Sequence, residues 1–325
     1  MNAWRFLGGA GLAVAMAAAA HASVAQSYPT KPVRMIVPYP PGGATDIFAR
    51  LVGAKLGEAL GQTFIIEQRP GAAGVIGADA AAKAASDGYT VFIGQASNLA
   101  INQHLMKKLP YDPVNDFAPI TRVASSPNLL VVHPSMPVHS IPDLVNLAKS
   151  KPGTINYASA GSGSPGHLAA EYFRKTAQID VVHIPYKGAA PAIMDVIAGQ
   201  VSYYFTSPIA AQPYVQAKRL RQVAVTSRKR FPPLPEVPAI AESGYENIDI
   251  ASWWGLLAPS GTPPEVIGRL HAATTKVLNS AEMRSRLASQ GAMVIAESPA
   301  EFASYIKSEI AKWEIIVKAS GARLD

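Results

Sequence analysis

The stretch VRMIVPYPPGGATDIFAR, from Val33 to Arg50, changes its pattern twice within a few residues. Val33 to Val37 is apolar and rich in β-formers, and Pro38 ends the run, which is typical of a buried strand. Prolines and glycines at positions 40–43 then break the pattern, and after Asp46 the apolar residues recur at helical spacing. The stretch therefore predicts a strand, a tight glycine turn and a helix with an acidic residue in its first turn.

Such a turn is suited to binding an anion. Gly42 and Gly43 allow the backbone to come close to a ligand, and the free N–H groups of a helix start favour negative charge. The alternative is a capped turn between strand and helix that binds nothing, and a single copy does not separate the two interpretations.

A second copy of the pattern lies between Thr154 and Thr176, TINYASAGSGSPGHLAAEYFRKT. We expect a strand at Ile155–Ala158, a loop of small residues at Ala160–Gly166 and a helix at His167–Lys175. Each copy is followed by two further predicted strands with another small-residue loop between them. These strands are expected at 64–67 and 89–93 after the first copy, and at 181–184 and 201–205 after the second.

Each half of the chain is thus predicted to be a βαβαβ unit. The small-residue loops fall at the carboxyl ends of the strands, which is where ligands bind in open α/β sheets. We expect an α/β fold of two lobes that face each other across a cleft ringed by helix N-termini.

The first residues have the features of a secretory signal peptide, predicted at 1–25. Arg5 is the charged residue, Phe6 to Ala20 is the apolar segment, and cleavage is expected after Ala22 or after Ala25. A membrane anchor is the rival interpretation, but this alanine-rich run is short for a span. We expect an exported, periplasmic protein.

The order of the remaining predicted elements suggests that the chain crosses between the lobes twice. Two apolar segments, 117–123 and 128–132, flank a turn predicted at Ser125–Pro127. A strand at 251–258 is expected to make the second crossing. Helices at 263–279, 281–290 and 299–319, with a short strand at 293–296, are expected to return to the first lobe. The predicted first lobe is 26–126 plus 238–325, and the second is 127–237.

Composition narrows the range of functions. The chain of 325 residues has no cysteine, which excludes thiol catalysis and cysteine-ligated metals, and its formal charge is +7. Loss of Arg5 with the signal peptide leaves 7 − 1 = +6, which suits small anions. The basic cluster at 218–230 has no aromatic platform, so we interpret it as a solvated surface and expect no nucleic-acid partner.

Enzyme signatures are weak in this sequence. Gly161 to Gly166 matches the dinucleotide pattern G-x-G-x-x-G, but Pro165 interrupts the phosphate turn and the first loop has no such pattern. No G-x-S-x-G nucleophile motif occurs, and the histidines have no metal-ligand spacing. We therefore expect a binding protein with no catalytic residues, no cofactor and no metal. The alternatives are a secreted carboxylate-processing enzyme on the same scaffold and a ligand sensor.

Six motifs in order resemble the Bug family, the extracytoplasmic solute-binding receptors of tripartite tricarboxylate transporters. They are YPPGGATD (39–46), RPGAAG (69–74), LPYDP (109–113), ASAGSGSP (158–165), PYKGAAP (185–191) and APSGTP (258–263). The resemblance implies a two-lobed periplasmic-binding-protein fold of type II. It also implies closure of the lobes on a small organic carboxylate, which the receptor delivers to the membrane permease subunits of the transporter.

The resemblance also implies a set of ligand-binding residues. The first binding loop, with the backbone at 42–44 holding one carboxylate, falls on Tyr39, Pro41, Gly42, Gly43, Ala44 and Asp46. Ser97 would also line the first lobe. The second binding loop falls on Ser159, Gly161, Ser162, Gly163, Ser164 and His167. The rest of the second lobe would contribute Tyr186, Lys187, Gly188, Thr206 and Ser207.

Overall fold

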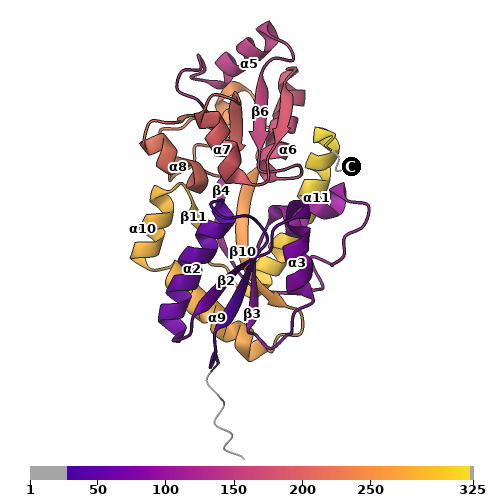
Figure 1. Ribbon diagram of the computed structural model, residues 1–325, viewed down its shortest axis with the longest axis vertical. Coiled ribbons are helices and arrows are strands. Elements are labelled where there is room, and N and C mark those ends of the chain that lie inside the picture. Colours follow the sequence, from indigo (N-terminus) through magenta and orange to yellow (C-terminus); the bar gives the residue numbers. More distant parts are fainter. Residues whose placement is uncertain (1–27, 323–325) are drawn as a thin grey trace, which may run out of the picture.

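The computed structural model describes residues 28–322, so the predicted signal peptide lies outside the described residues. Figure 1 shows two α/β lobes arranged one above the other along the long axis of the molecule. Within residues 28–322, no helix combines the length and the apolar character needed to cross a membrane.

The sheet of the first lobe has six strands in the order β11-β4-β10-β3-β1-β2. Strand β1 lies between β2 and β3 and runs parallel to both, whereas β10 pairs antiparallel with β3 and β4. The strands are β1 (Val33–Val37), β2 (Phe64–Gln68), β3 (Thr90–Gln95), β4 (Phe117–Pro127), β10 (Ala251–Pro259) and β11 (Met293–Val294).

The sheet of the second lobe has five strands in the order β7-β6-β8-β5-β9. Here β6 lies between β7 and β8 and runs parallel to both, as β1 does in the first lobe. The strands are β5 (Leu129–Val132), β6 (Asn156–Ser159), β7 (Val182–Pro185), β8 (Tyr203–Thr206) and β9 (Arg221–Val225). The two predicted βαβαβ units therefore share one topology.

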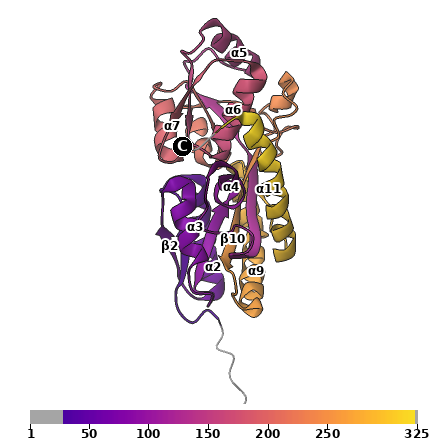
Figure 2. The same cartoon turned by 90° about the vertical axis from the view of Figure 1, so that its right-hand side faces the viewer.

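Helices cover both sheets. In the first lobe these are α2 (Ala44–Leu60), α3 (Val75–Ala82), α4 (Asn102–Leu105), α9 (Pro264–Leu278), α10 (Ala281–Ser289) and α11 (Pro299–Ser320), with short turns of helix η1 (Ala72–Gly74) and η2 (Ser97–Ile101). In the second lobe they are α5 (Ile141–Ser150), α6 (Pro165–Ala177), α7 (Ala189–Ile197) and α8 (Pro208–Gln216), followed by η3 (Ile240–Ser243). Helix α11 packs on β4 and also reaches α6, so it extends beside both lobes (Figure 2).

Strand β10 organises the core of the first lobe because its two tryptophans point to opposite faces. Trp253 packs edge-on against Phe302 of α11, and Trp254 packs against Phe48 of α2, a residue that is fully buried. The indole N–H of Trp253 donates to the buried Glu309 carboxylate at 2.8 Å, which satisfies a polar group inside the core.

The turn predicted at Ser125–Pro127 is wrong, because β4 continues through all three residues. They pair with 251–253 of β10, and the Ser125 hydroxyl donates to the Ser252 carbonyl at 3.3 Å. Partner strand pairing thus overrides the local turn preference of serine and proline. Only Asn128 separates β4 from β5 at the first crossing. The chain returns between β9 and β10, and the lobe boundaries stay a prediction.

Candidate functional site

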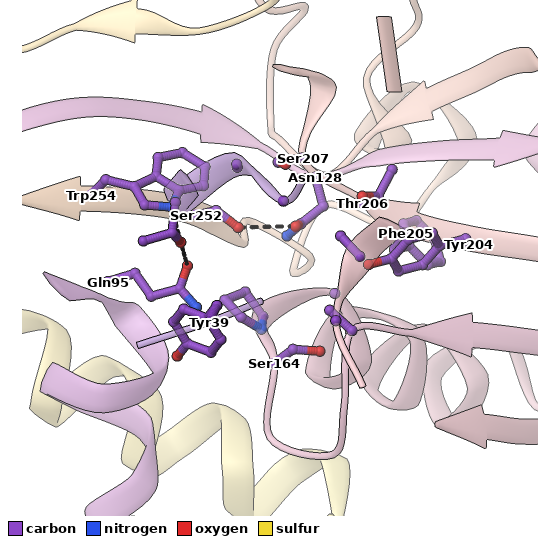
Figure 3. A pocket seen from close by; sticks show the side chains of 18 of the residues that line it. Tyr39, Gln95, Asn128, Ser164, Tyr204, Phe205, Thr206, Ser207, Ser252 and Trp254 are labelled. Atoms are coloured by element: carbon purple, nitrogen blue, oxygen red, sulfur yellow. Dashed lines mark hydrogen bonds between the residues drawn. The ribbon is translucent and has the colours of Figure 1, made fainter. Parts of the chain in front are cut away.

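Four helices begin around one cavity between the lobes. Figure 3 shows side chains that line this cavity. The residues that precede their first turns are Gly43 for α2, Ser164 for α6, Gly188 for α7 and Ser207 for α8, and all four line this inner cavity. Its volume is about 80 Å³. Because helix starts carry partial positive charge and free N–H groups, their convergence favours an anion.

The first loop is held by a buried carboxylate. Asp46 is 5% exposed, and its oxygens accept hydrogen bonds from the Gly42 N–H at 3.0 Å and from the Gln68 side chain at 2.9 Å. Arg50 lies 2.9 Å from the same carboxylate. In the described part of the chain no side chain caps α2, so its first N–H groups remain available as donors. Asp46 therefore fixes the conformation of the loop and does not line the cavity.

The second loop is held in a similar way by His167 and Ser159, and Ser159 in turn contacts His183. The Gly163 N–H donates to His167 Nδ1 at 3.2 Å, and the Gly161 N–H donates to the Ser159 hydroxyl at 3.2 Å. His183 Nε2 lies 2.7 Å from that hydroxyl. Ser159 and His167 are both buried, so they support the loop rather than line the cavity.

The two histidine rings lie against each other, with centroids 4.2 Å apart. Burial, together with the neighbouring His183, lowers the pKa of His167 from its ordinary value of 6.5 to about 4. Burial also lowers the pKa of His183. Both rings are therefore neutral at pH 7, which leaves His167 Nδ1 free to accept from Gly163.

Acidification is expected to destabilise the chain through His167. Between pH 6.5 and about pH 4, His167 binds a proton in the unfolded chain but not in the folded one. The free energy of unfolding therefore decreases as the pH falls through this range. The shift corresponds to about 3 kcal/mol of unfolding free energy. Urea unfolding of the wild type and of His167→Gln across this pH range measures this contribution to the free energy of unfolding. Glutamine can accept a hydrogen bond from the Gly163 N–H but does not titrate. An unchanged pH dependence in the variant would contradict the assignment.

The loops of the two lobes touch around the cavity. The Ser97 hydroxyl donates across the cleft to the Gly163 carbonyl at 3.4 Å. A Cβ built on Gly43 would lie 3.8 Å from Ala189 Cβ, and one built on Gly188 would lie 3.5 Å from Pro40 Cγ. The structure therefore has the lobes closed on one another at the binding loops.

Neutral side chains complete the inner cavity. Among the described residues, none that lines it is charged. The Ser252 hydroxyl donates to Asn128 Oδ1 at 3.1 Å. Asn128 joins β4 to β5 at the first crossing between the lobes, and Ser252 is the second residue of β10. Thr206 is 3% exposed, and its hydroxyl has no hydrogen-bond partner within residues 28–322. Leaving a buried hydroxyl unpaired costs free energy, so Thr206 is suited to a polar ligand atom.

The predicted site residues divide into three groups. The inner cavity is lined by Tyr39, Gly43, Ala44, Ser164, Gly188, Thr206 and Ser207. A larger adjoining cavity brings in Gly161, Ser162, Tyr186 and Lys187. Neither cavity is lined by Pro41, Gly42, Asp46, Ser97, Ser159, Gly163 or His167. Ligand contact by the first two groups stays a prediction.

Sequence reasoning missed the part of the cavity wall that comes from the β4–β5 link and from β10. This wall contains Asn128, Ser252 and Trp254. The Trp254 indole N–H donates to the Thr45 hydroxyl at 3.0 Å, which donates in turn to Gln95 Oε1 at 3.0 Å (Figure 3). The available signal was a polar residue, Asn128, directly before the apolar run 129–132 at the first crossing.

Two α/β lobes of one topology, closed on a cavity between them, define the class of two-lobed solute-binding proteins. The sequence model of a protein family, described as the tripartite tricarboxylate transporter family receptor, matches residues 48–322 of this chain. The chain belongs to this family, which confirms both the resemblance drawn from the six motifs and the predicted fold class.

Similar proteins cover nearly the whole chain. Protein BugT of Bordetella pertussis (strain Tohama I) is 36% identical over 325 residues, which is 100% of both chains. The structure of R. palustris Rpa4515 with adipate has a TM-score of 0.89 and 38% identity, covering 91% of this chain and 100% of that one. The structure of MatC (Rpa3494) from Rhodopseudomonas palustris with bound malate has a TM-score of 0.84 and 31% identity, covering 89% of this chain and 100% of that one.

Proposed function

We propose that this chain is a periplasmic receptor that captures a small organic carboxylate between its lobes and delivers it to the membrane subunits of a tripartite tricarboxylate transporter. The observation that carries the proposal is the convergence of four helix starts on a cavity lined by neutral residues. The proposal includes export by the predicted signal peptide. The adipate and malate complexes of similar receptors support the ligand class.

The energies involved agree with such a receptor. One helix start stabilises an anion by roughly 0.3 to 2 kcal/mol, so several helix starts together supply a moderate part of the binding free energy. Micromolar binding needs about 8 kcal/mol. The remainder must come from side-chain donors such as Thr206 and from the apolar walls, Tyr39 and Trp254 among them. A receptor that later releases its ligand to a permease gains from this moderate affinity.

Binding without turnover is part of the proposal. The titratable groups behind the two loops, Asp46 and His167, both use their side-chain acceptors to hold loop N–H groups. Neither lines the inner cavity. A general acid or base must come within hydrogen-bond reach of the reacting atom, and these two are engaged elsewhere.

Thermal unfolding of the mature chain against a panel of compounds tests the proposal. The panel contains adipate, malate and other carboxylates, with amino acids and NAD as comparisons. A ligand at a hundred times its dissociation constant adds about 2.7 kcal/mol, which raises the melting temperature by several degrees. We expect a shift with a subset of carboxylates and recovery of that acid unchanged by mass spectrometry. A shift with NAD alone, or conversion of the bound acid, would contradict the proposal.

A further inference from the structure

A second, outer cavity adjoins the inner one and is lined by residues of both lobes. Its volume is about 710 Å³, several times that of the inner cavity. The two share four lining residues, which are Tyr39, Pro40, Ala160 and Gly188. The outer cavity is lined from the first lobe by 70–74 and Met106, and from the second by 160–162 and 186–188.

The segment 70–74 of the first lobe, which lines the outer cavity, has an unusual backbone conformation. Ala72 and Ala73 have φ angles of 45° and 53°, in the left-handed region that disfavours residues other than glycine. Tyr39 and Asn102 hold this turn in place, because the Ala73 carbonyl accepts from the Tyr39 hydroxyl at 3.2 Å and from Asn102 Nδ2 at 3.1 Å. Backbone strain of this kind is concentrated at functional sites.

The outer cavity combines an apolar wall with one cation. Pro70, the two alanines and Met106 supply the apolar surface on one side. Lys187 is the only charged residue among the described residues that line either cavity, and it forms no ion pair within residues 28–322.

The Asp195 carboxylate of α7 already accepts a hydrogen bond from the residue that precedes Lys187. The Tyr186 hydroxyl donates to the Asp195 carboxylate at 2.6 Å, which fixes the tyrosine side chain beside Lys187. Burial and the adjacent Asp195 raise the pKa of Tyr186 to about 12, so the hydroxyl keeps its proton at neutral pH. Lys187 is therefore the one charged side chain, among the described residues that line the outer cavity, that can pair with a second anionic group.

We propose that the outer cavity holds the distal half of an elongated straight-chain dicarboxylate. This inference rests on the proposed function, in which the first carboxylate lies among the helix starts of the inner cavity. The methylene chain passes beside Tyr39 and packs on the strained alanine turn and Met106. The second carboxylate pairs with Lys187.

Calorimetric titration of the mature chain with diacids from succinate to sebacate tests the inference. Each fully buried methylene raises affinity about fourfold, so affinity is expected to increase with length up to about suberate. Octanoate has the same chain as suberate without the distal carboxylate. Because an exposed ion pair contributes little, we expect Lys187→Gln to weaken suberate about two- to fivefold and to leave octanoate and succinate unchanged.

Met106→Asp is a second variant that does not touch the lysine. It places a negative charge on the apolar wall and is expected to weaken suberate more than succinate. Lys151→Gln, at an exposed lysine outside both cavities, is the matched control. Tight binding of succinate with no gain for longer diacids would overturn the inference and leave the proposed function standing. Binding of no carboxylate at all would overturn both.

Discussion

Replacing Gly43 with valine is expected to lower adipate affinity roughly 100-fold while the chain remains folded. Gly43 lies where the first loop meets α7, and a Cβ at this position would already be 3.8 Å from Ala189 Cβ. The two extra methyl groups of valine would enter that contact and the space beside the helix start. The lobes could then close only by displacing the loop that binds the carboxylate.

The backbone at Gly43 accepts a side chain, so loss of binding would not reflect loss of the fold. Its φ and ψ are −87° and 170°, an extended conformation that valine also adopts. Valine is a poorer N-cap than glycine, which costs at most about 1 kcal/mol of stability. Gly268→Val, at an exposed glycine of α9 with no atom within 4 Å of its added Cβ, is the matched control. Calorimetry with adipate that finds wild-type affinity in Gly43→Val would remove the first loop from the site.

Gly166→Ala is expected to have the largest effect on stability, a loss of about 3 kcal/mol. Gly166 lies in the first turn of α6, where the helix approaches β8 more closely than a side chain permits. An added Cβ would be 2.0 Å from the Phe205 carbonyl oxygen, which is backbone and cannot rotate away. Either α6 or β8 must move, and both carry residues of the inner cavity.

Urea unfolding measures this loss, and Gly268→Ala is its control. Nothing lies within 4 Å of an added Cβ at Gly268, so alanine there is expected to leave stability unchanged or to raise it by up to about 1 kcal/mol. Wild-type stability and adipate affinity in Gly166→Ala would contradict the role of this close approach in placing the start of α6.

Much of the fold could be predicted from the sequence because the same local signals occur twice. In each half a short apolar run ends at a small-residue loop and a helical pattern follows, and the observed strands β1 and β6 start the two units. The bounds of an element were predicted to within a few residues where the apolar periodicity and the turn residues indicated the same end. At Ser125–Pro127 the residue types indicated a turn, but pairing with β10 extends the strand through them.

The site was harder to predict because the sequence does not show which way a polar side chain points. Asp46 and His167 belong to the predicted binding loops, yet their side chains point away from the cavity and hold the Gly42 and Gly163 N–H groups. Asn128 lies in no binding motif, yet it lines the cavity from the link between β4 and β5. Such directions depend on how two lobes far apart in sequence are placed together.

Calorimetric titration of the mature chain with adipate and with its diamide, adipamide, tests the central claim most directly. The two compounds have the same length and nearly the same shape, and only the diacid carries negative charge. If the converging helix starts recognise a carboxylate, adipate binds and adipamide binds at least about tenfold more weakly, a difference of 1.4 kcal/mol. Equal affinity for the two compounds would contradict the account.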